Sequence, residues 1–444
     1  MRGFLIAGTG SGVGKTTLTA GILSSLSKKM RVQPFKVGPD FIDPMYHTAA
    51  TGRASRNLDS FMMGEDTIRN LVGYCSKDAD LCVVEGVRGL YEGSAGDSDL
   101  GSTAHIAKML GLPVVLVVDA GSLTRSAAAI VNGFRSFDPD VRIAGVILNK
   151  VSGPQHSGKL DLAMSTYCPG VKVLGKIRKD ASVTLGQRHL GLNTVKRFDP
   201  ETADNLAAIG EMVDSDGLME IAESVDVDLP SSSPYRKHDA GAKVAVPMDE
   251  AFSFYYRDNL ECLSASGMEP VYFDAVAGES LPEADMVYLG GGYPELYAGQ
   301  ISANTDFIEG VHNMSDEGKP VYGECGGLMT MCDSIRLKDG SVHRMCGIFH
   351  GESVFTGVRH GPAYVVAEPI GGNPFFKDTV KGHEYHYSDV YPAGNPSYGF
   401  RNSRGTGISD GYDGLYVKKS LGSYMHQHAL SMDDWAAGFR ESLV

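Results

Sequence analysis

The stretch that most constrains the fold is GTGSGVGKTT, residues 8–17, which directly follows the apolar run GFLIAG at 3–8. A glycine-rich turn between a strand and a helix cradles phosphates with its backbone N–H groups. The helix N-terminus adds positive potential, and a lysine neutralises the terminal phosphates. We therefore predict a nucleotide-binding loop, formed by Gly10, Gly12, Val13, Gly14, Lys15, Thr16 and Thr17.

The spacing of this loop departs from the strict pattern G-x-x-x-x-G-K-[ST]. That pattern requires glycine at position 9, where the chain has Thr9, and the glycine stands one residue earlier, at Gly8. The departure bears on the subfamily rather than on nucleotide binding. The alternative, a glycine turn that merely begins a helix, does not account for Lys15 and Thr16 at the point where a strand gives way to a helix.

The first half of the chain alternates short apolar runs with helical stretches, which is typical of a doubly wound parallel sheet in the α/β class. At 444 residues the chain exceeds what one hydrophobic core usually supports. An acidic, then Ser- and Pro-rich segment interrupts the pattern, and strand-like runs resume after it. We expect a nucleotide-binding domain at 1–227, a linker at 228–241 and a second α/β domain at 242–444.

Carboxylates follow two of the predicted strands. Glu85 ends LCVVE, and KVGPDFIDP carries Lys36, Asp40 and Asp43 into a loop. Ligands of parallel sheets bind at the carboxyl ends of the strands, and nucleotide chemistry needs a carboxylate there to hold magnesium. We predict Mg²⁺ ligands at Thr16, Asp43 and Glu85 and a catalytic role for Asp40. The alternative for Asp40 alone is a turn and helix cap.

A second candidate centre is the cysteine in KPVYGECGGL. Cys325 stands between Gly323 and the Gly326–Gly327 pair, where a strand is expected to turn sharply into a helix. We expect a nucleophilic thiol whose pKa is lowered by the helix N-terminus. The glycine loop of YLGGGYPE supplies candidate oxyanion-hole N–H groups, at Gly291 and Gly292.

A nucleophilic thiol needs a basic partner, and thirteen histidines are available. Two clusters stand out, GHEYHYS and SYMHQH. The residues alone do not choose among the four histidines of these clusters, which are His383, His386, His426 and His428.

Composition narrows the function classes. A formal net charge of -14 disfavours a non-specific nucleic-acid binder. The most apolar run, LPVVLVV at 112–118, is too short to cross a membrane. No secretory signal is expected at the N-terminus. Seven cysteines without a C-x-x-C pair suit reduced thiols in the cytoplasm.

With both centres described, the chain resembles the cobyrinate a,c-diamide synthase family from end to end. The matching blocks are GTGSGVGKTT, KVGPDFIDPMYH, GRASRNLDSFM, EGVRGLYEG, GSTAHIAKML, GGGYPE, GECGGL, GHEYHYS and SYMHQH. The resemblance implies a dethiobiotin-synthetase-like ATPase domain joined to a class I glutamine amidotransferase domain. It also accounts for Gly8, because that ATPase group shows the same shifted glycine.

The resemblance further implies a reaction. ATP, with Mg²⁺, phosphorylates the a and c acetate carboxylates of a tetrapyrrole, and glutamine hydrolysed through a Cys325 thioester supplies the ammonia. His426 lies where these enzymes carry the base. They commonly carry a glutamate two residues later, and this chain has His428 instead. Candidate cations for the poly-carboxylate substrate are Lys36, Arg53, Arg56 and Arg88.

Three alternatives stay open at this point. Nickel-sirohydrochlorin presents the same acetate groups as cobyrinate, and the motifs do not separate the two substrates. Cobyric acid synthases are usually longer and differ in the phosphate loop. A nucleotide switch with an inactive amidotransferase domain would carry an extra early lysine in that loop, where this chain has none. The family is compatible with a homo-oligomer.

Overall fold

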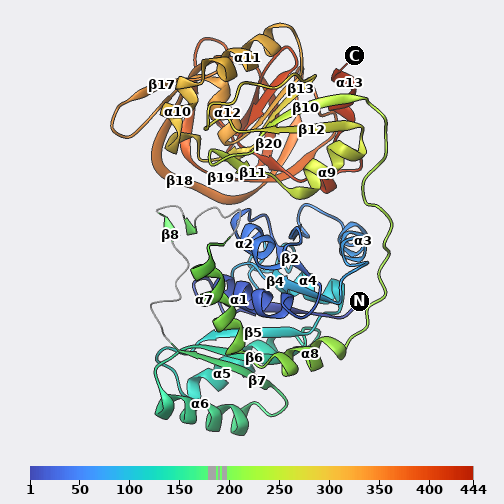
Figure 1. Cartoon of the computed structure of the whole chain (residues 1–444), viewed down its shortest axis with the longest axis vertical. Coiled ribbons are helices and arrows are strands. Elements are labelled where there is room, and N and C mark those ends of the chain that lie inside the picture. Colours follow the sequence, from blue (N-terminus) through green and yellow to red (C-terminus); the bar gives the residue numbers. More distant parts are fainter. Residues whose placement is uncertain (179–186, 189–190, 193–197, 444) are drawn as a thin grey trace. The chain divides into compact units, whose positions relative to one another are not determined.

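The structure is a computed structural model that describes residues 1–178, 187–188, 191–192 and 198–443. It divides into two compact units, Met1–Pro234 and Tyr235–Val444 (Figure 1). Each unit has its own cluster of buried apolar side chains. The two units are therefore described separately.

Unit 1 is built on a seven-stranded parallel sheet with the order β3-β2-β4-β1-β5-β6-β7. The central strands GFLIAG, LCVVE and VVLVVD are almost continuously apolar, as expected when helices cover both faces of a parallel sheet. This confirms the predicted doubly wound α/β fold. The strands are β1 Gly3–Gly8, β2 Val32–Val37, β3 Arg56–Leu58, β4 Leu81–Glu85, β5 Val114–Asp119, β6 Ile143–Val151 and β7 Lys172–Arg178.

Helices connect these strands. They are α1 Lys15–Ser27, α2 Ile42–Thr51, α3 Glu65–Cys75, α4 Thr103–Leu110, α5 Arg125–Phe137, α6 Pro154–Tyr167, α7 Pro200–Glu211 and α8 Ser215–Glu223, and a short antiparallel pair, β8 Gln187–Arg188 and β9 Gly191–Leu192, precedes α7. Helices α1 and α7 approach closely, because a Cβ on Gly210 would lie 2.1 Å from the carbonyl oxygen of Gly21. One core cluster lies beneath α1, α7 and α8.

The topology of unit 1 indicates at which edge of the sheet a ligand would bind. Strand β1 lies between β4 and β5, and β4 lies between β1 and β2. The loops that leave the carboxyl ends of β1, β2 and β4 therefore meet at one edge of the sheet, next to the point where the strand order reverses. This edge carries the glycine-rich loop.

Unit 2 contains a twelve-stranded mixed sheet with the order β12-β10-β13-β15-β22-β21-β20-β18-β16-β17, and β19 pairs with β18 and β23. Its first five strands are parallel, and β22 to β18 are antiparallel. The strands are β10 Ala242–Pro247, β12 Met268–Phe273, β13 Met286–Leu289, β15 Val321–Glu324, β16 Cys332–Arg336, β17 Val342–Arg344, β18 Phe349–Pro369, β19 Val380–Pro392, β20 Tyr398–Arg404, β21 Tyr412–Val417, β22 Ser420–Ser423 and β23 His426–Gln427.

Two further strands, β11 Phe252–Phe254 and β14 Gly291–Gly292, form a small antiparallel ribbon that anchors the second glycine loop. The helices of unit 2 are α9 Arg257–Ala265, η2 Pro294–Leu296, α10 Ala298–Ala303, α11 Thr305–Asp316, α12 Gly326–Met331, η3 Ala429–Ser431 and α13 Ala437–Ser442. No helix of the described residues has the length and apolar character needed to span a membrane.

Two candidate active sites

The glycine-rich loop of unit 1 runs from the end of β1 to the first residue of α1. Gly12 and Gly14 adopt positive φ angles of 78° and 94°, which favour glycine. The side chain of Lys15 folds back over the loop, and its Nζ donates to the carbonyl oxygens of Gly10, at 3.3 Å, and of Arg88. Burial and the nearby Lys36 lower the pKa of Lys15. The lysine thus sits where phosphates would replace these carbonyl acceptors.

Residues at the carboxyl ends of β5 and β6 hold the glycine-rich loop in place, a contribution that the sequence analysis missed. Asn149 donates from Nδ2 to the carbonyl oxygen of Val13 at 2.8 Å. A Cβ on Gly14 would lie 2.4 Å from the same nitrogen, so glycine is needed there for space as well as for its φ angle. Lys150 bridges the carbonyl oxygen of Gly12, at 3.4 Å, and Asp119, at 2.6 Å.

Glu85, at the end of β4, is the centre of a buried network. Its Oε1 accepts from Thr16 Oγ1 at 3.2 Å and from Lys36 Nζ at 3.0 Å. Its Oε2 lies 2.6 Å from Nε2 of His47, on α2, and neither side chain is exposed to solvent. His47 was not predicted as a site residue, although it stands in the KVGPDFIDPMYH block.

Lys36 is fully engaged within this network. Its Nζ lies 2.5 Å from Asp43 Oδ2 and 3.0 Å from Glu85 Oε1, and it donates to the carbonyl oxygen of Gly86 at 3.0 Å. Burial opposes the charge on Lys36, but the two carboxylates outweigh it and hold its pKa above the ordinary value. Burial likewise opposes ionisation of Glu85, and Lys36 and His47 hold the pKa of Glu85 below its ordinary value. Lys36 therefore offsets part of the negative charge of these two carboxylates.

Asp40 lies at the same sheet edge in the loop before α2. Its Oδ1 accepts from the backbone N–H of Ile42 at 2.9 Å, the turn contact expected at this position. Asn57, on β3, holds the loop by donating to the carbonyl oxygens of Gly38 and Asp40, each at 2.8 Å. Burial and the neighbouring Asp43 carboxylate raise the pKa of Asp40.

The three candidate arginines lie in different places. Arg88 is exposed in the loop after β4, with its carbonyl oxygen on Lys15. Arg56 is buried at the start of β3. Arg53 follows α2 and reaches the amino end of the sheet, where it pairs with Asp78 at 2.8 Å and with Gln33 at 3.1 Å. Thus Arg53 is not brought together with the other candidates.

The oxygen donors at this edge suit magnesium. Mg²⁺ prefers hard oxygen ligands and is usually held by one or two carboxylates together with phosphate oxygens and water. Thr16 Oγ1 and Glu85 Oε1 face each other at 3.2 Å, and Asp43 is linked to Glu85 through Lys36. Within the described residues no group of three or more His, Cys, Asp or Glu side chains forms a preassembled metal cage. The residues therefore fit an ion that is completed by a nucleotide.

In unit 2, Cys325 forms the elbow between β15 and α12. Its backbone is strained, with φ 49° and ψ −97°, and its N–H donates to the carbonyl oxygen of Ser423 at 2.7 Å. The Sγ atom lies 4.0 Å from the carbonyl oxygen of Tyr385, on β19. The elbow thus brings the thiol next to two strands of the histidine region.

The second glycine loop packs against both the elbow and His426. A Cβ on Gly326 would lie 3.2 Å from the backbone nitrogen of Gly292, and a Cβ on Gly291 would lie 2.3 Å from Cε1 of His426. His426 pairs with His383 in the register of β23 and β19, and its ring stacks on that of His383 with centroids 4.9 Å apart. Cys325, Gly291, Gly292 and His426 therefore belong to one cluster.

The other histidines are engaged in different ways. His386 stacks on Tyr424 with ring centroids 3.6 Å apart. His383 Nδ1 lies 3.2 Å from the hydroxyl of Tyr256. His428 accepts the backbone N–H of Leu430 on Nδ1 at 3.2 Å. Burial lowers the pKa of both His383 and His386, so these two rings are neutral at physiological pH.

The protonation state of the thiol corrects one expectation. Burial, with a smaller contribution from Glu295, raises the pKa of Cys325, whereas the sequence predicted that the helix would lower it. The six-residue helix α12 begins in a site where the thiol is only 5% exposed, and removal from water outweighs the helix terminus. Burial also raises the pKa of Glu295 to about 7. The thiol is thus protonated in the unliganded protein, and a base has to take its proton.

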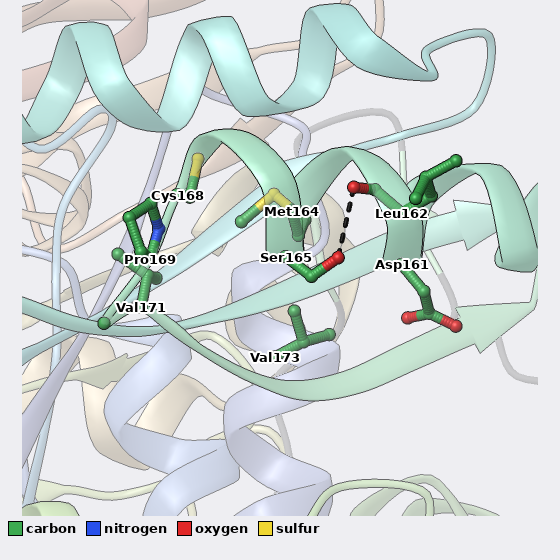
Figure 2. Close-up of a pocket in the computed structure, with 9 residues that line it drawn as sticks. Asp161, Leu162, Met164, Ser165, Cys168, Pro169, Val171 and Val173 are labelled. Atoms are coloured by element: carbon green, nitrogen blue, oxygen red, sulfur yellow. Dashed lines mark hydrogen bonds between the residues drawn. The ribbon is translucent and has the colours of Figure 1, made fainter.

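Unit 1 also contains a pocket of about 620 Å³ between α6 and the start of β7 (Figure 2). Its lining includes Asp161, Met164 and Cys168, and Ser165 donates to the carbonyl oxygen of Leu162 at 3.2 Å. None of the predicted site residues lines this pocket.

Comparison with known proteins identifies the domain to which each of the two regions belongs. Residues 4–192 match the CobQ/CobB/MinD/ParA nucleotide-binding domain, and residues 243–434 match the CobB/CobQ-like glutamine amidotransferase domain. Similar proteins are the cobyrinate a,c-diamide synthases of Methanococcus vannielii, 41% identical over 97% of this chain and 97% of that protein, and of Methanosphaera stadtmanae, 41% identical over 100% and 99%. The cobyrinate a,c-diamide synthase of Methanothermobacter thermautotrophicus is 42% identical over 98% of each chain.

Proposed function

Because the chain belongs to the cobyrinate a,c-diamide synthase family, and is therefore an ATP-dependent, glutamine-using carbon–nitrogen ligase, we propose that it amidates the a and c acetate carboxylates of cobyrinate in cobalamin biosynthesis. The observation that carries this proposal is the pairing of a nucleotide loop, with Lys15 folded over it, and a cysteine elbow, clustered with His426, in one chain. We place the reaction in the cytoplasm, where the free thiols stay reduced.

The first half-reaction is assigned to unit 1. A carboxylate oxygen of the substrate attacks the γ-phosphorus of ATP, which forms an acyl phosphate and releases ADP. Lys15 stabilises the charge on the transferring phosphoryl group, largely by position and electrostatics. Mg²⁺, when held by Thr16, Asp43 and Glu85, supplies further positive charge to the phosphate oxygens. Ammonia then attacks the acyl carbon and displaces phosphate, and we assign to Asp40 the proton that this nitrogen loses.

The second half-reaction is assigned to unit 2. Sγ of Cys325 attacks the side-chain carboxamide carbon of glutamine while His426 takes the thiol proton. His426 returns this proton to the leaving ammonia, and water then hydrolyses the thioester to glutamate. The backbone N–H groups of Gly291 and Gly292 are the proposed donors to the oxyanion. This division of labour accounts for two chemical centres in one chain, since carboxylate and ammonia do not condense unaided in water.

The first test is Cys325→Ala. Glutamine-dependent diamide formation should vanish, while a high concentration of ammonium salt at mildly alkaline pH should restore the product, because free ammonia bypasses unit 2. Cys332→Ala is the matched control, since Cys332 is a buried thiol at the other end of α12. It should keep both activities.

Two outcomes would contradict this scheme. If Cys325→Ala kept full glutamine activity, Cys325 would not be the nucleophile. If the folded, nucleotide-binding variant failed with glutamine and with ammonia alike, the two half-reactions would not be separable.

The substrate needs its own experiment. Purified cobyrinate and purified nickel-sirohydrochlorin are each incubated with ATP, glutamine and Mg²⁺, and diamide formation is followed by mass spectrometry. We expect efficient diamidation of cobyrinate. If diamide formed from nickel-sirohydrochlorin but not from cobyrinate, nickel-sirohydrochlorin would be the substrate, and the assignment to cobalamin biosynthesis would be wrong.

A further inference from the structure

The glutaminase centre lacks an acid at the position where class I amidotransferases commonly carry one, two residues after the histidine. His428 stands there, and its side chain is committed elsewhere. Its Nδ1 accepts the N–H of Leu430, and its Nε2 faces Oδ2 of Asp258 at 3.4 Å. His428 therefore does not act as the orienting group for His426.

A different carboxylate faces His426. Glu324, the last residue of β15 and the residue before the nucleophile, lies with Oε2 3.6 Å from Nδ1 of His426. Both side chains are almost completely buried. In the described part of the chain this is the one ion pair in which Glu324 takes part.

The carboxylate of Glu324 is held in this orientation from two sides. Its Oε1 accepts from the hydroxyl of Tyr322, on its own strand, at 2.9 Å and from the backbone N–H of Gln427, on β23, at 3.3 Å. Gln427 is itself fixed, because its side chain accepts from Trp435 at 3.1 Å and its carbonyl oxygen accepts from Asn259 at 2.8 Å. The carboxylate and the imidazole are thus tied to the same short strand.

The chemistry of the step gives this contact a role. When Cys325 loses its proton to His426, an imidazolium forms in a buried site, where an unpaired charge is costly. A carboxylate on Nδ1 stabilises that charge and fixes the tautomer, which leaves Nε2 to exchange protons with the thiol. Catalytic hydrogen bonds are often long in unliganded enzymes and shorten in the substrate complex. A separation of 3.6 Å fits that behaviour.

We propose that Glu324 is the positioning residue of the glutaminase centre and orients His426. In other class I amidotransferases this role commonly belongs to an acidic residue two positions after the histidine. The orienting acid is then the last residue of β15, and the nucleophile is the next residue, at the elbow itself. This inference rests on the proposed function, in which Cys325 and His426 perform glutamine hydrolysis.

The test is Glu324→Gln in the full-length enzyme, with kcat and KM for glutamine hydrolysis measured separately. We expect kcat to fall on the order of 10²–10⁴-fold, as when the orienting acid of a catalytic triad is neutralised, with KM changed less than about threefold. Ammonia-dependent amidation should be unchanged, because unit 1 is untouched. Glu324→Asp keeps the charge and should recover part of kcat.

Asp258→Asn is the matched control. Asp258 is also a buried carboxylate that faces a histidine in the same unit, but its partner is His428. Its neutralisation should leave kcat for glutamine hydrolysis within about threefold of wild type. An equal loss in both variants would show that any buried acid in this region supports the fold, and would overturn the proposal.

Alkylation of Cys325 by an electrophilic glutamine analogue separates positioning from misfolding. In Glu324→Gln the number of labelled Cys325 sites per chain should match wild type while the labelling rate falls, whereas a misfolded unit would lose sites. A labelling rate and kcat near wild type would refute the role of Glu324. If Cys325→Ala retained glutaminase activity, the proposed function itself would fail, and this result is distinguishable from failure of the inference.

Discussion

The contact between Gly291 and His426 offers a sharp test of the glutaminase geometry. A methyl group at position 291 would lie 2.3 Å from Cε1 of the imidazole, far inside an ordinary contact of 3.4 Å or more. Gly291→Ala therefore forces the ring to retreat by about 1 Å. Neither side yields easily, because Gly291 pairs with Phe254 in a ribbon and His426 pairs with His383.

A misplacement of about 1 Å in a catalytic group costs roughly 10²-fold in rate, or about 2.7 kcal/mol of activation free energy. We therefore expect Gly291→Ala to lower kcat for glutamine hydrolysis about 10²-fold. The backbone N–H proposed for the oxyanion hole remains in this variant. Ammonia-dependent amidation should stay near wild type, which would show that unit 1 is intact.

Gly299→Ala is the matched control, because a Cβ at this position in α10 meets no atom closer than 3.8 Å, on His343. It should keep kcat within about twofold of wild type. Full glutaminase activity in Gly291→Ala would refute the reasoning, since the base could then tolerate displacement or would not be His426.

Four further outcomes are expected. Lys15→Ala should abolish amide synthesis from glutamine and from ammonia alike while glutamine hydrolysis persists, and appreciable synthesis would remove the phosphate loop from the mechanism. Glu85→Gln should shift the magnesium titration of amide synthesis to higher concentration, because the variant loses one carboxylate charge, and an unchanged titration would make Glu85 purely structural. Because burial raises the pKa of Cys325, its alkylation by iodoacetamide in the unliganded enzyme should be slow at neutral pH and accelerate as pH rises, and a flat pH dependence by peptide mapping would contradict a protonated thiol. His428→Ala should lower glutaminase kcat far less than His426→Ala, and equal losses would return His428 to the catalytic centre.

The segments that form the two candidate sites could be predicted from the sequence, because each is defined by a motif of only a few consecutive residues. The strand, glycine loop and helix around Lys15 and the glycine-flanked turn at Cys325 both appear as expected. The parallel sheet also follows from local patterns, since a buried strand is apolar throughout. The comparisons confirm the family to which these motifs pointed.

The partners of the site side chains could not be predicted from the sequence, because they depend on contacts between segments that are distant in the chain. His47 reaches Glu85 across 38 residues, and Asn149 reaches the glycine loop across 136. Glu324 stood in the quoted GECGGL motif, but only the pairing of β15, β22 and β23 with their neighbours brings it to His426.

Arg53 illustrates a different kind of difficulty. The sequence analysis grouped it with Lys36 as a candidate cation for the poly-carboxylate substrate. Helix α2 lies between them and carries the chain from the carboxyl end of the sheet back toward its amino end, where Arg53 pairs with Asp78. Lys36 and Arg53 are therefore close in the sequence but lie at opposite ends of the sheet.

The strained backbone of Cys325 has a consequence for how this protein withstands heat. A non-glycine residue held at φ 49° and ψ −97° costs on the order of 1–3 kcal/mol, and glycine at this position would relieve much of that cost. An inactive protein with Cys325→Gly should therefore survive higher temperatures than one with Cys325→Ala. Selection for thermal stability alone would therefore favour glycine at position 325, whereas the proposed glutamine hydrolysis requires the thiol.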